Sequence, residues 1–141
     1  MNTKRIGNIT EMEVMLAFLK QGYNVLIPYG DCERYDFVAD VNGNFLRIQV
    51  KTSHLDDENT KIIFSTASTH RADGKIIRHS YSKKDIDYFA TSCNGIVYLI
   101  PVEEATTRAK SLRLSPTKNG QVKGVSFAKD YTMEEVIKNW S

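Results

Sequence analysis

The Asn-Gly dipeptide at residues 42–43 lies between two stretches, 34–41 and 44–52, in which apolar and polar residues alternate. Asn-Gly in this context is the strongest short-range signal for a β-hairpin with a two-residue turn. Such a turn pairs Val41 with Asn44 and thereby fixes the register of every other pair along the two strands. This hairpin constrains the fold more than any other segment of the chain.

The predicted register separates the hairpin into two faces, because successive residues of a strand point to opposite sides. The apolar face is expected to consist of Tyr35, Phe37, Ala39, Leu46, Ile48 and Val50. The other face carries Asp36, which lies opposite Gln49, together with Lys51. The hairpin therefore brings an acid, an amide and a base from two separate stretches onto one polar surface.

A helix is expected ahead of the hairpin, over about residues 9–21. Asn8 is a candidate N-cap, Glu11 stands three residues later as in a capping box, and Gly22 ends the helix. The spacing predicts a buried face made of Met12, Met15, Leu16 and Leu19. Glu11 then borders the buried side of the helix.

Further strands and two more helices follow from the rest of the pattern. We expect strands at 23–28, 61–66, 95–101 and 112–114, and a polar, basic loop or hairpin at 69–80 with a turn at Asp73-Gly74. We also expect a short helix from Ser82 to about Ser92. A capping box at Thr132 opens a C-terminal helix that buries Met133, Val136, Ile137 and Trp140. This order predicts a single domain over residues 1–141, of the α/β (α+β) class, with a mixed central β-sheet flanked by helices.

Composition narrows the cellular setting. No apolar run approaches the roughly 20 residues of a membrane span, and no apolar segment follows Lys4 and Arg5 as it would in a secretory signal. Cys32 and Cys93 match no metal-ligand or redox spacing. A cytoplasmic location, with association to the nucleoid through DNA, is expected.

Charge is unevenly distributed, although the formal net charge is only +2. Residues 1–60 hold six basic and nine acidic residues, whereas residues 61–141 hold thirteen and eight. An acidic half suits the binding of a cation, and a basic half suits a polyanion. A solvated charged surface accounts for a bias of this size equally well.

The polar face of the hairpin carries the groups that phosphodiester hydrolysis requires. Asp36 supplies a carboxylate, and the Gln49 amide and the Val50 backbone carbonyl supply further hard oxygen ligands for a divalent cation. Lys51 supplies a cation that can position water or stabilise the phosphate. Glu11, on the first predicted helix, can reach the same surface.

These residues resemble a known family. Asp36 followed by Gln49-Val50-Lys51 on the adjoining strand is similar to the core of the PD-(D/E)XK nuclease superfamily, and the run 7–11 (GNITE) resembles its resolvase branch, whose helix supplies a glutamate. Most of the chain resembles the homing endonucleases of this fold encoded in bacterial group I introns. The resemblance implies a restriction-endonuclease-like core, Mg²⁺ bound by the residue matching Asp36, and a catalytic role for Lys51.

Two positions depart from the motif of that superfamily. Tyr35 stands where the motif has proline, which is often absent, and Gln49 stands where the motif has its second acid. Because glutamine cannot neutralise a cation, the site is poor in negative charge, which favours Glu11 as a further metal ligand. Each residue also has a structural alternative. Asp36 can be an ordinary acid on the solvent face, and Glu11 can complete a capping box. Gln49 can pair across the sheet, and Lys51 can be a surface lysine.

Residues 61–84 are the candidate DNA-contact segment, with six basic residues and one acid. Its proposed contacts combine phosphate-binding and base-reading side chains: Lys61, Ser68, Thr69, His70, Arg71, Lys75, Arg78 and His79. A charged, exposed hairpin without a ligand is the alternative. Cutting two strands needs two active sites, so a homo-oligomer, either a dimer or a tetramer, is expected.

The leading functional hypothesis is a site-specific homing endonuclease that makes Mg²⁺-dependent double-strand breaks in DNA and leaves 5′-phosphates. A Holliday-junction resolvase or a restriction-type nuclease uses the same core, so the motif alone does not separate them. A third hypothesis, from a different class, is a DNA-binding module that has lost cleavage together with the second acid.

Overall fold

The structure is a computed structural model that describes residues 1–105 and 108–140. Its main helices are α1 (Thr3–Lys20) and α2 (Met133–Ile137). Its strands are β1 (Asn24–Leu26), β2 (Phe37–Val41), β3 (Asn44–Val50), β4 (His54–Leu55), β5 (Lys61–Ser65), β6 (Ala67–Ala72), β7 (Lys75–Ser80), β8 (Tyr88–Cys93), β9 (Ile96–Pro101) and β10 (Ala109–Arg113). Two short 3₁₀ helices, Val102–Glu104 and Ala128–Asp130, complete the elements.

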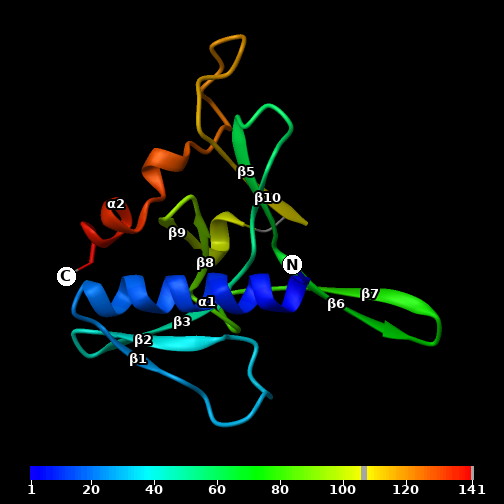
Figure 1. Ribbon diagram of the computed structural model, residues 1–141, viewed down its shortest axis with the longest axis vertical. Coiled ribbons are helices and arrows are strands. Elements are labelled where there is room, and N and C mark those ends of the chain that lie inside the picture. Colours follow the sequence, from blue (N-terminus) through cyan, green and yellow to red (C-terminus); the bar gives the residue numbers. More distant parts are fainter. Residues whose placement is uncertain (106–107, 141) are drawn as a thin grey trace.

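A five-stranded sheet of order β1-β2-β3-β8-β9 forms the centre of the molecule (Figure 1). The β3–β8 pair is parallel and the other pairs are antiparallel, so the sheet is mixed, as predicted. The hairpin register is also confirmed, because Val41 pairs with Asn44 and Phe37 with Ile48. Asn42, with φ 55°, and the glycine after it both adopt the left-handed backbone that this turn requires.

Helix α1 begins earlier than predicted. Its N-cap is Asn2, whose side chain accepts a hydrogen bond from the Arg5 amide at 2.8 Å. Asn8 therefore lies inside the helix, and the capping box proposed for Asn8 and Glu11 is wrong. The predicted end near Gly22 is confirmed, since the helix stops at Lys20 and Gly22 has φ +88°.

The buried face of α1 is also not the predicted one. Thr10, Val14 and Phe18 are buried against the sheet, whereas Met12, Leu16 and Leu19 are 67%, 50% and 53% exposed. Both stripes are apolar at helical spacing, so periodicity alone could not choose between them. Packing made the choice: the Phe18 ring lies edge-on to Phe37, with centroids 5.5 Å apart.

Two hydrophobic cores cover the two faces of the central sheet. One lies under α1 and α2 and contains Phe37, Ala39 and Ile48, which are fully buried as predicted. The other packs the sheet against β5 and β10 through Phe64, Phe89, Ile100 and Leu112. Tyr35 belongs to this second core, because the chain before β2 no longer follows the hairpin's alternation.

The helix predicted from Ser82 to Ser92 is wrong. The Ser82 carbonyl accepts hydrogen bonds from the amides of Asp85 and Ile86, which closes a single turn. The chain then enters β8, where Phe89, Ala90 and Thr91 are buried between β3 and β9. A strand buried on both faces shows no alternation of polarity, which is why the segment resembled part of a helix.

The other predicted elements are confirmed with small changes of length, and β4 was not predicted. Thr132 caps α2 by accepting from the Glu135 amide at 3.2 Å. The apolar residues of this C-terminal segment pack on the core under α1, as predicted. Within the described residues, no helix has both the length and the hydropathy to cross a membrane.

Candidate active site

Asp36 lies immediately before β2, at the start of an inner strand of the central sheet. Its amide donates to the Ile48 carbonyl at 2.8 Å, and its carboxylate accepts from the Val50 amide at 2.7 Å. The hairpin therefore holds both the backbone and the side chain of Asp36. Burial raises the pKa of this carboxyl above its usual range, while the Val50 amide and then the Lys51 ammonium act in the opposite direction.

Glu11 reaches the same place from α1. It is half-buried, and its pKa is raised by burial and, next, by the negative charge of Asp36. Two carboxyl groups with raised pKa values, close enough to act on each other, form a site that gains from a bound cation. A second carboxyl group therefore lies near Asp36, on the helix and not at position 49.

Lys51 and Gln49 complete the group on β3 and just beyond it. Lys51 Nζ donates to the Ala67 carbonyl at 3.2 Å, and its pKa is lowered mainly by burial. The Gln49 amide nitrogen donates to the Val50 carbonyl at 3.5 Å, in a bond that does not involve Asp36. We call Glu11, Asp36, Gln49, Val50 and Lys51 the Asp36 site.

The donor set of the Asp36 site fits Mg²⁺, because it offers two carboxylates, an amide oxygen and a backbone carbonyl, all hard oxygen ligands. Within residues 1–105 and 108–140, no three His, Cys, Asp or Glu side chains group into a metal site by themselves. A metal here would therefore depend on the amide, the carbonyl, water or the substrate for its remaining ligands.

Strands β6 and β7 form a two-stranded ribbon that projects beyond the N-terminal end of α1 (Figure 1). The predicted turn is confirmed, since Asp73 and Gly74 have φ 52° and 73°. The register places Thr69, Arg71 and Arg78 on one face of the ribbon. The other face carries Ser68, His70, Lys75 and His79.

Several proposed DNA contacts are placed differently by the structure. Lys61 begins β5, at the end of that strand remote from the ribbon, so it does not join the other proposed contacts (Figure 1). Ser68 lies at the foot of the ribbon, where its hydroxyl accepts from Arg34 Nη2 at 3.0 Å. The rings of His70 and His79 stack at 4.7 Å, with a 3.1 Å contact between their nitrogens.

Sequence reasoning missed Arg34 and Tyr81. The Arg34 guanidinium lies 3.8 Å from the centroid of the buried Tyr81 ring, and Lys51 Nζ lies 5.2 Å from the same centroid. Both residues surround the Asp36 site. The contacts that Tyr81 makes with Arg34 and Lys51 join residues at least 30 positions apart in the sequence, so no local pattern could have identified them.

Comparison with known proteins establishes the family. The sequence profile of the PD-(D/E)XK endonuclease family matches residues 1–134, which is nearly the whole chain. The protein therefore belongs to the PD-(D/E)XK endonuclease family, as the resemblance of its motif predicted. A search of curated proteins found no match.

Among solved structures, the fold is similar to that of the bacterial homing endonuclease I-Ssp6803I. The TM-score is 0.81, and the match covers 98% of this chain and 93% of the other, with 24% sequence identity. At this identity the likeness establishes the fold, and the predicted restriction-endonuclease-like core is confirmed.

Proposed function

We propose that this nuclease is a site-specific homing endonuclease that uses Mg²⁺ to cut both strands of DNA and leaves 5′-phosphates. The observation that carries the proposal is the Asp36 site itself. The Val50 amide fixes the carboxylate of Asp36, and Lys51 lies beside it. Glu11 lies close enough to Asp36 that the negative charge of Asp36 helps to raise the pKa of Glu11. The ribbon begins next to this site, at Ala67.

In the proposed mechanism, Mg²⁺ would be held by Asp36, Glu11, the Val50 carbonyl and the Gln49 oxygen, and would supply Lewis acidity at the phosphate. Lys51 would orient the attacking water or hold a phosphate oxygen. Its lowered pKa makes the neutral amine more accessible than in a surface lysine. Val50 and Ile48 hold Asp36 in place through their backbone groups.

Homing, rather than junction resolution, is supported by the ribbon. Two-stranded ribbons fit the major groove, where arginine reads guanine by paired hydrogen bonds. Arg71 and Arg78 lie on one exposed face of the ribbon, away from the histidine pair. Mobility of a group I intron is the biological role that this reading implies, in line with the name of the solved homing endonuclease that shares the fold.

The test is cleavage of a library of DNA sites and of a four-way junction with Mg²⁺ or with EDTA. We expect cutting of particular duplex sites in Mg²⁺ only, and products that DNA ligase rejoins without prior phosphorylation. Selective cutting of the junction would favour the resolvase hypothesis. Binding without any cutting would favour the non-catalytic module, for which the missing second acid at Gln49 is the specific observation.

We also propose that two copies associate through the exposed stripe of α1. A shallow apolar groove is formed by this stripe and the chain after β1, and Met12, Leu16, Leu19 and Ile27 are at least half exposed there. An exposed apolar patch of this kind is typical of an interface with another chain, and a second copy is the partner that cutting both strands requires. The aromatic residues of the last 50 positions offer less surface for such an interface, because Tyr98, Phe127, Tyr131 and Trp140 are buried or half-buried.

Sedimentation of the Leu16→Glu protein tests this interface. We expect it to dissociate at concentrations at which the unchanged protein is oligomeric, because the substitution places two charges in an apolar contact. Val122→Glu is the control, since Val122 is 69% exposed and lies outside the groove. Equal association of both variants would exclude this face as the interface.

A further inference from the structure

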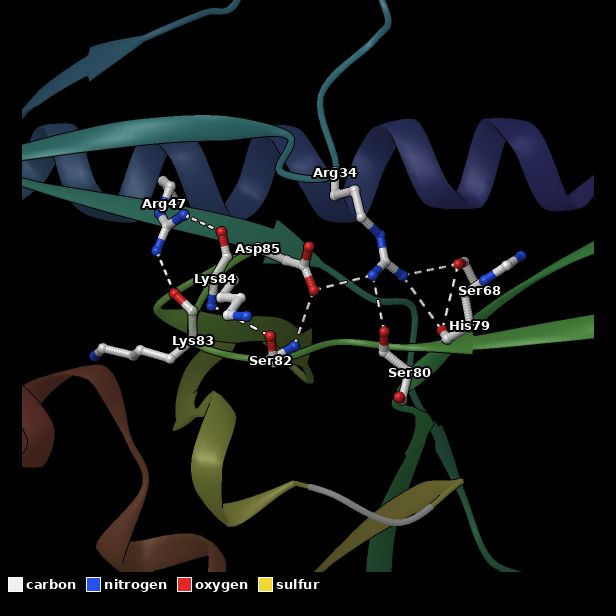
Figure 2. Close-up of polar contacts among 9 residues, drawn as sticks. All are labelled: Arg34, Arg47, Ser68, His79, Ser80, Ser82, Lys83, Lys84 and Asp85. Carbon is white, nitrogen blue, oxygen red and sulfur yellow. Dashed lines mark hydrogen bonds and ion pairs between the residues drawn. The ribbon is translucent and has the colours of Figure 1, made fainter.

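Arg34 connects the foot of the ribbon to the body of the protein. Its Nη1 donates to the Ser80 carbonyl at 2.8 Å and to Asp85 Oδ2 at 3.0 Å. Its Nη2 donates to Ser68 Oγ at 3.0 Å and to the His79 carbonyl at 3.3 Å. Figure 2 shows the guanidinium between the two ribbon strands on one side and Asp85 on the other.

The ribbon needs such a connection. Strands β6 and β7 pair with each other and join neither of the other two sheets of the described residues. An isolated two-stranded hairpin is only marginally stable, so its direction depends on contacts at its foot. Arg34 contacts both strands there, and its stacking on the buried Tyr81 ring fixes the plane of the guanidinium.

The same contacts reach the Asp36 site. Arg34 lies two residues before Asp36 in the chain, and Lys51 Nζ donates to the carbonyl of Ala67, the first residue of the ribbon. Any movement of the foot of the ribbon would therefore act on Lys51 directly. Arg34 thus lies where the ribbon, which would hold the DNA, meets the groups that would act on the phosphate.

We propose that Arg34 is a positioning residue that fixes the angle between the ribbon and the Asp36 site, so that DNA bound by the ribbon presents its phosphate to Asp36 and Lys51. This inference rests on the proposed function. In this role Arg34 acts through its contacts with Ser68, Ser80 and Asp85 and not on the reacting atoms. A displacement of about 1 Å at a reacting group can lower a rate by about 100-fold, so a rigid connection matters.

Arg47 provides a matched control. Its side chain is 31% exposed, against 33% for Arg34, and it is also paired with an aspartate, Asp87, at 3.2 Å. It also donates to two backbone carbonyls, those of Lys83 and Lys84, at 2.6 and 2.7 Å (Figure 2). Arg47 thus makes the same kinds of contact as Arg34 without touching the ribbon.

The experiment compares Arg34→Gln and Arg47→Gln in single-turnover cleavage and in DNA binding without Mg²⁺. For Arg34→Gln we expect the cleavage rate to fall by about 10- to 100-fold while the dissociation constant changes by less than about 3-fold. For Arg47→Gln we expect the rate of the folded protein to stay within about 3-fold. Equal losses in the two variants, or a loss of binding that accounts for the whole effect of Arg34→Gln, would overturn the proposal.

Two further variants separate geometry from charge and from folding. Arg34→Lys retains the charge but cannot form the paired bonds, so we expect it to be as slow as Arg34→Gln; full rescue by lysine would overturn the proposal. Asp85→Asn weakens the connection from the body side, and we expect a smaller loss of rate that is not additive with Arg34→Gln. If Arg34→Gln does not fold, an unchanged rate in Asp85→Asn overturns the proposal.

Amide hydrogen exchange distinguishes failure of this inference from failure of the proposed function. In the free protein, Arg34→Gln should speed exchange across β6 and β7, and Arg47→Gln should not. This result requires no cleavage. If the unchanged protein cuts no DNA but Arg34→Gln still speeds exchange in the ribbon, only the proposed function is refuted. If Arg34→Gln leaves exchange unchanged, the role of Arg34 is refuted.

Discussion

The Asp36 site and the ribbon differ in how their residues are held. Asp36, Gln49 and Lys51 are half-buried, and their backbones belong to or adjoin the central sheet. Thr69, His70 and the residues of β7 are exposed on a pair of strands outside that sheet. Under the proposed function, the groups that meet the phosphate lie on or beside the central sheet, and the groups that follow the groove lie on the exposed ribbon.

This contrast separates rate from affinity. Changes to the two carboxyl groups of the Asp36 site, those of Asp36 and Glu11, should lower the rate of cleavage and leave DNA binding intact, because neither carboxylate attracts a polyanion. Changes on the ribbon should weaken DNA binding and leave the rate of the bound complex intact. A variant of either region that alters both would show that the division is false.

The largest effect is expected for Asp36→Ala. Without this carboxylate the site loses its best-fixed metal ligand, so we expect the single-turnover rate to fall by at least about 1,000-fold while the dissociation constant stays within about 3-fold. Asp40→Asn is the control on the same hairpin, since Asp40 lies near the turn, where it accepts a bond from the Gly43 amide at 2.9 Å. Retained cutting by Asp36→Ala would remove the proposed active site.

Glu11→Gln is expected to have the next largest effect. The amide keeps the shape of the side chain but removes the second negative charge, so we expect cleavage to be about 10- to 100-fold slower at low Mg²⁺ and to recover partly at high Mg²⁺. Glu13→Gln is the matched control on the same helix, where Glu13 accepts from the Ser92 hydroxyl at 3.1 Å. Titration of the rate with Mg²⁺ measures both. An equal response of the two variants would leave Asp36 as the sole acidic ligand.

The positions of Asp36, Val50 and Lys51 could be predicted from the sequence because one local signal, the hairpin turn, determines them. The turn at 42–43 fixed the register, and the register brought Asp36 next to Val50 and Lys51. The prediction that Glu11 reaches the same surface had a different basis, because the capping box proposed for Asn8 and Glu11 does not form. Its position rested on the family resemblance and on the side of the helix that it borders.

Three features could not be predicted in this way: the buried stripe of α1, the strand β8 and the partners of Arg34. Each depends on which surface meets which other surface, and the sequence offered two apolar stripes for α1 and no alternation for β8. The contacts of Arg34 join residues 34 to 51 positions apart. Periodicity and turn signals describe neighbours within a segment, so they carry no information about such pairs.

The two faces of the ribbon sharpen the comparison further. His70 and His79 contact each other, whereas Arg71 and Arg78 lie on the opposite face. We therefore expect Arg78→Ala to weaken binding of the target by about 10-fold and to relax base preference near its contact, and His70→Ala to change binding by less than about 3-fold. Fluorescence anisotropy with target and scrambled duplexes measures both. A larger effect from His70→Ala would indicate that the face carrying the histidines, and not the face carrying the arginines, enters the groove.

The smallest effect concerns the stability of the Asp36 site without metal. Because burial raises the pKa of Asp36 in the folded protein, the native state holds its proton more tightly than the unfolded state does. Stability therefore falls as the pH rises from about 4, the unfolded value, through the raised pKa, and the charged carboxylate costs stability at neutral pH.

Asp36→Asn removes that charge and can keep the bond from Val50. In EDTA we expect the variant to match the unchanged protein near pH 4 and to exceed its free energy of unfolding at pH 7.5 by at most about 1 kcal/mol, since partial exposure lets solvent screen the charge. Adding Mg²⁺ should stabilise the unchanged protein and not the variant, because only a metal bound to the folded state adds stability. Urea unfolding at the two pH values measures both differences. If the variant is less stable than the unchanged protein in EDTA at pH 7.5, the charged carboxylate of Asp36 does not destabilise the metal-free protein, and this prediction is wrong.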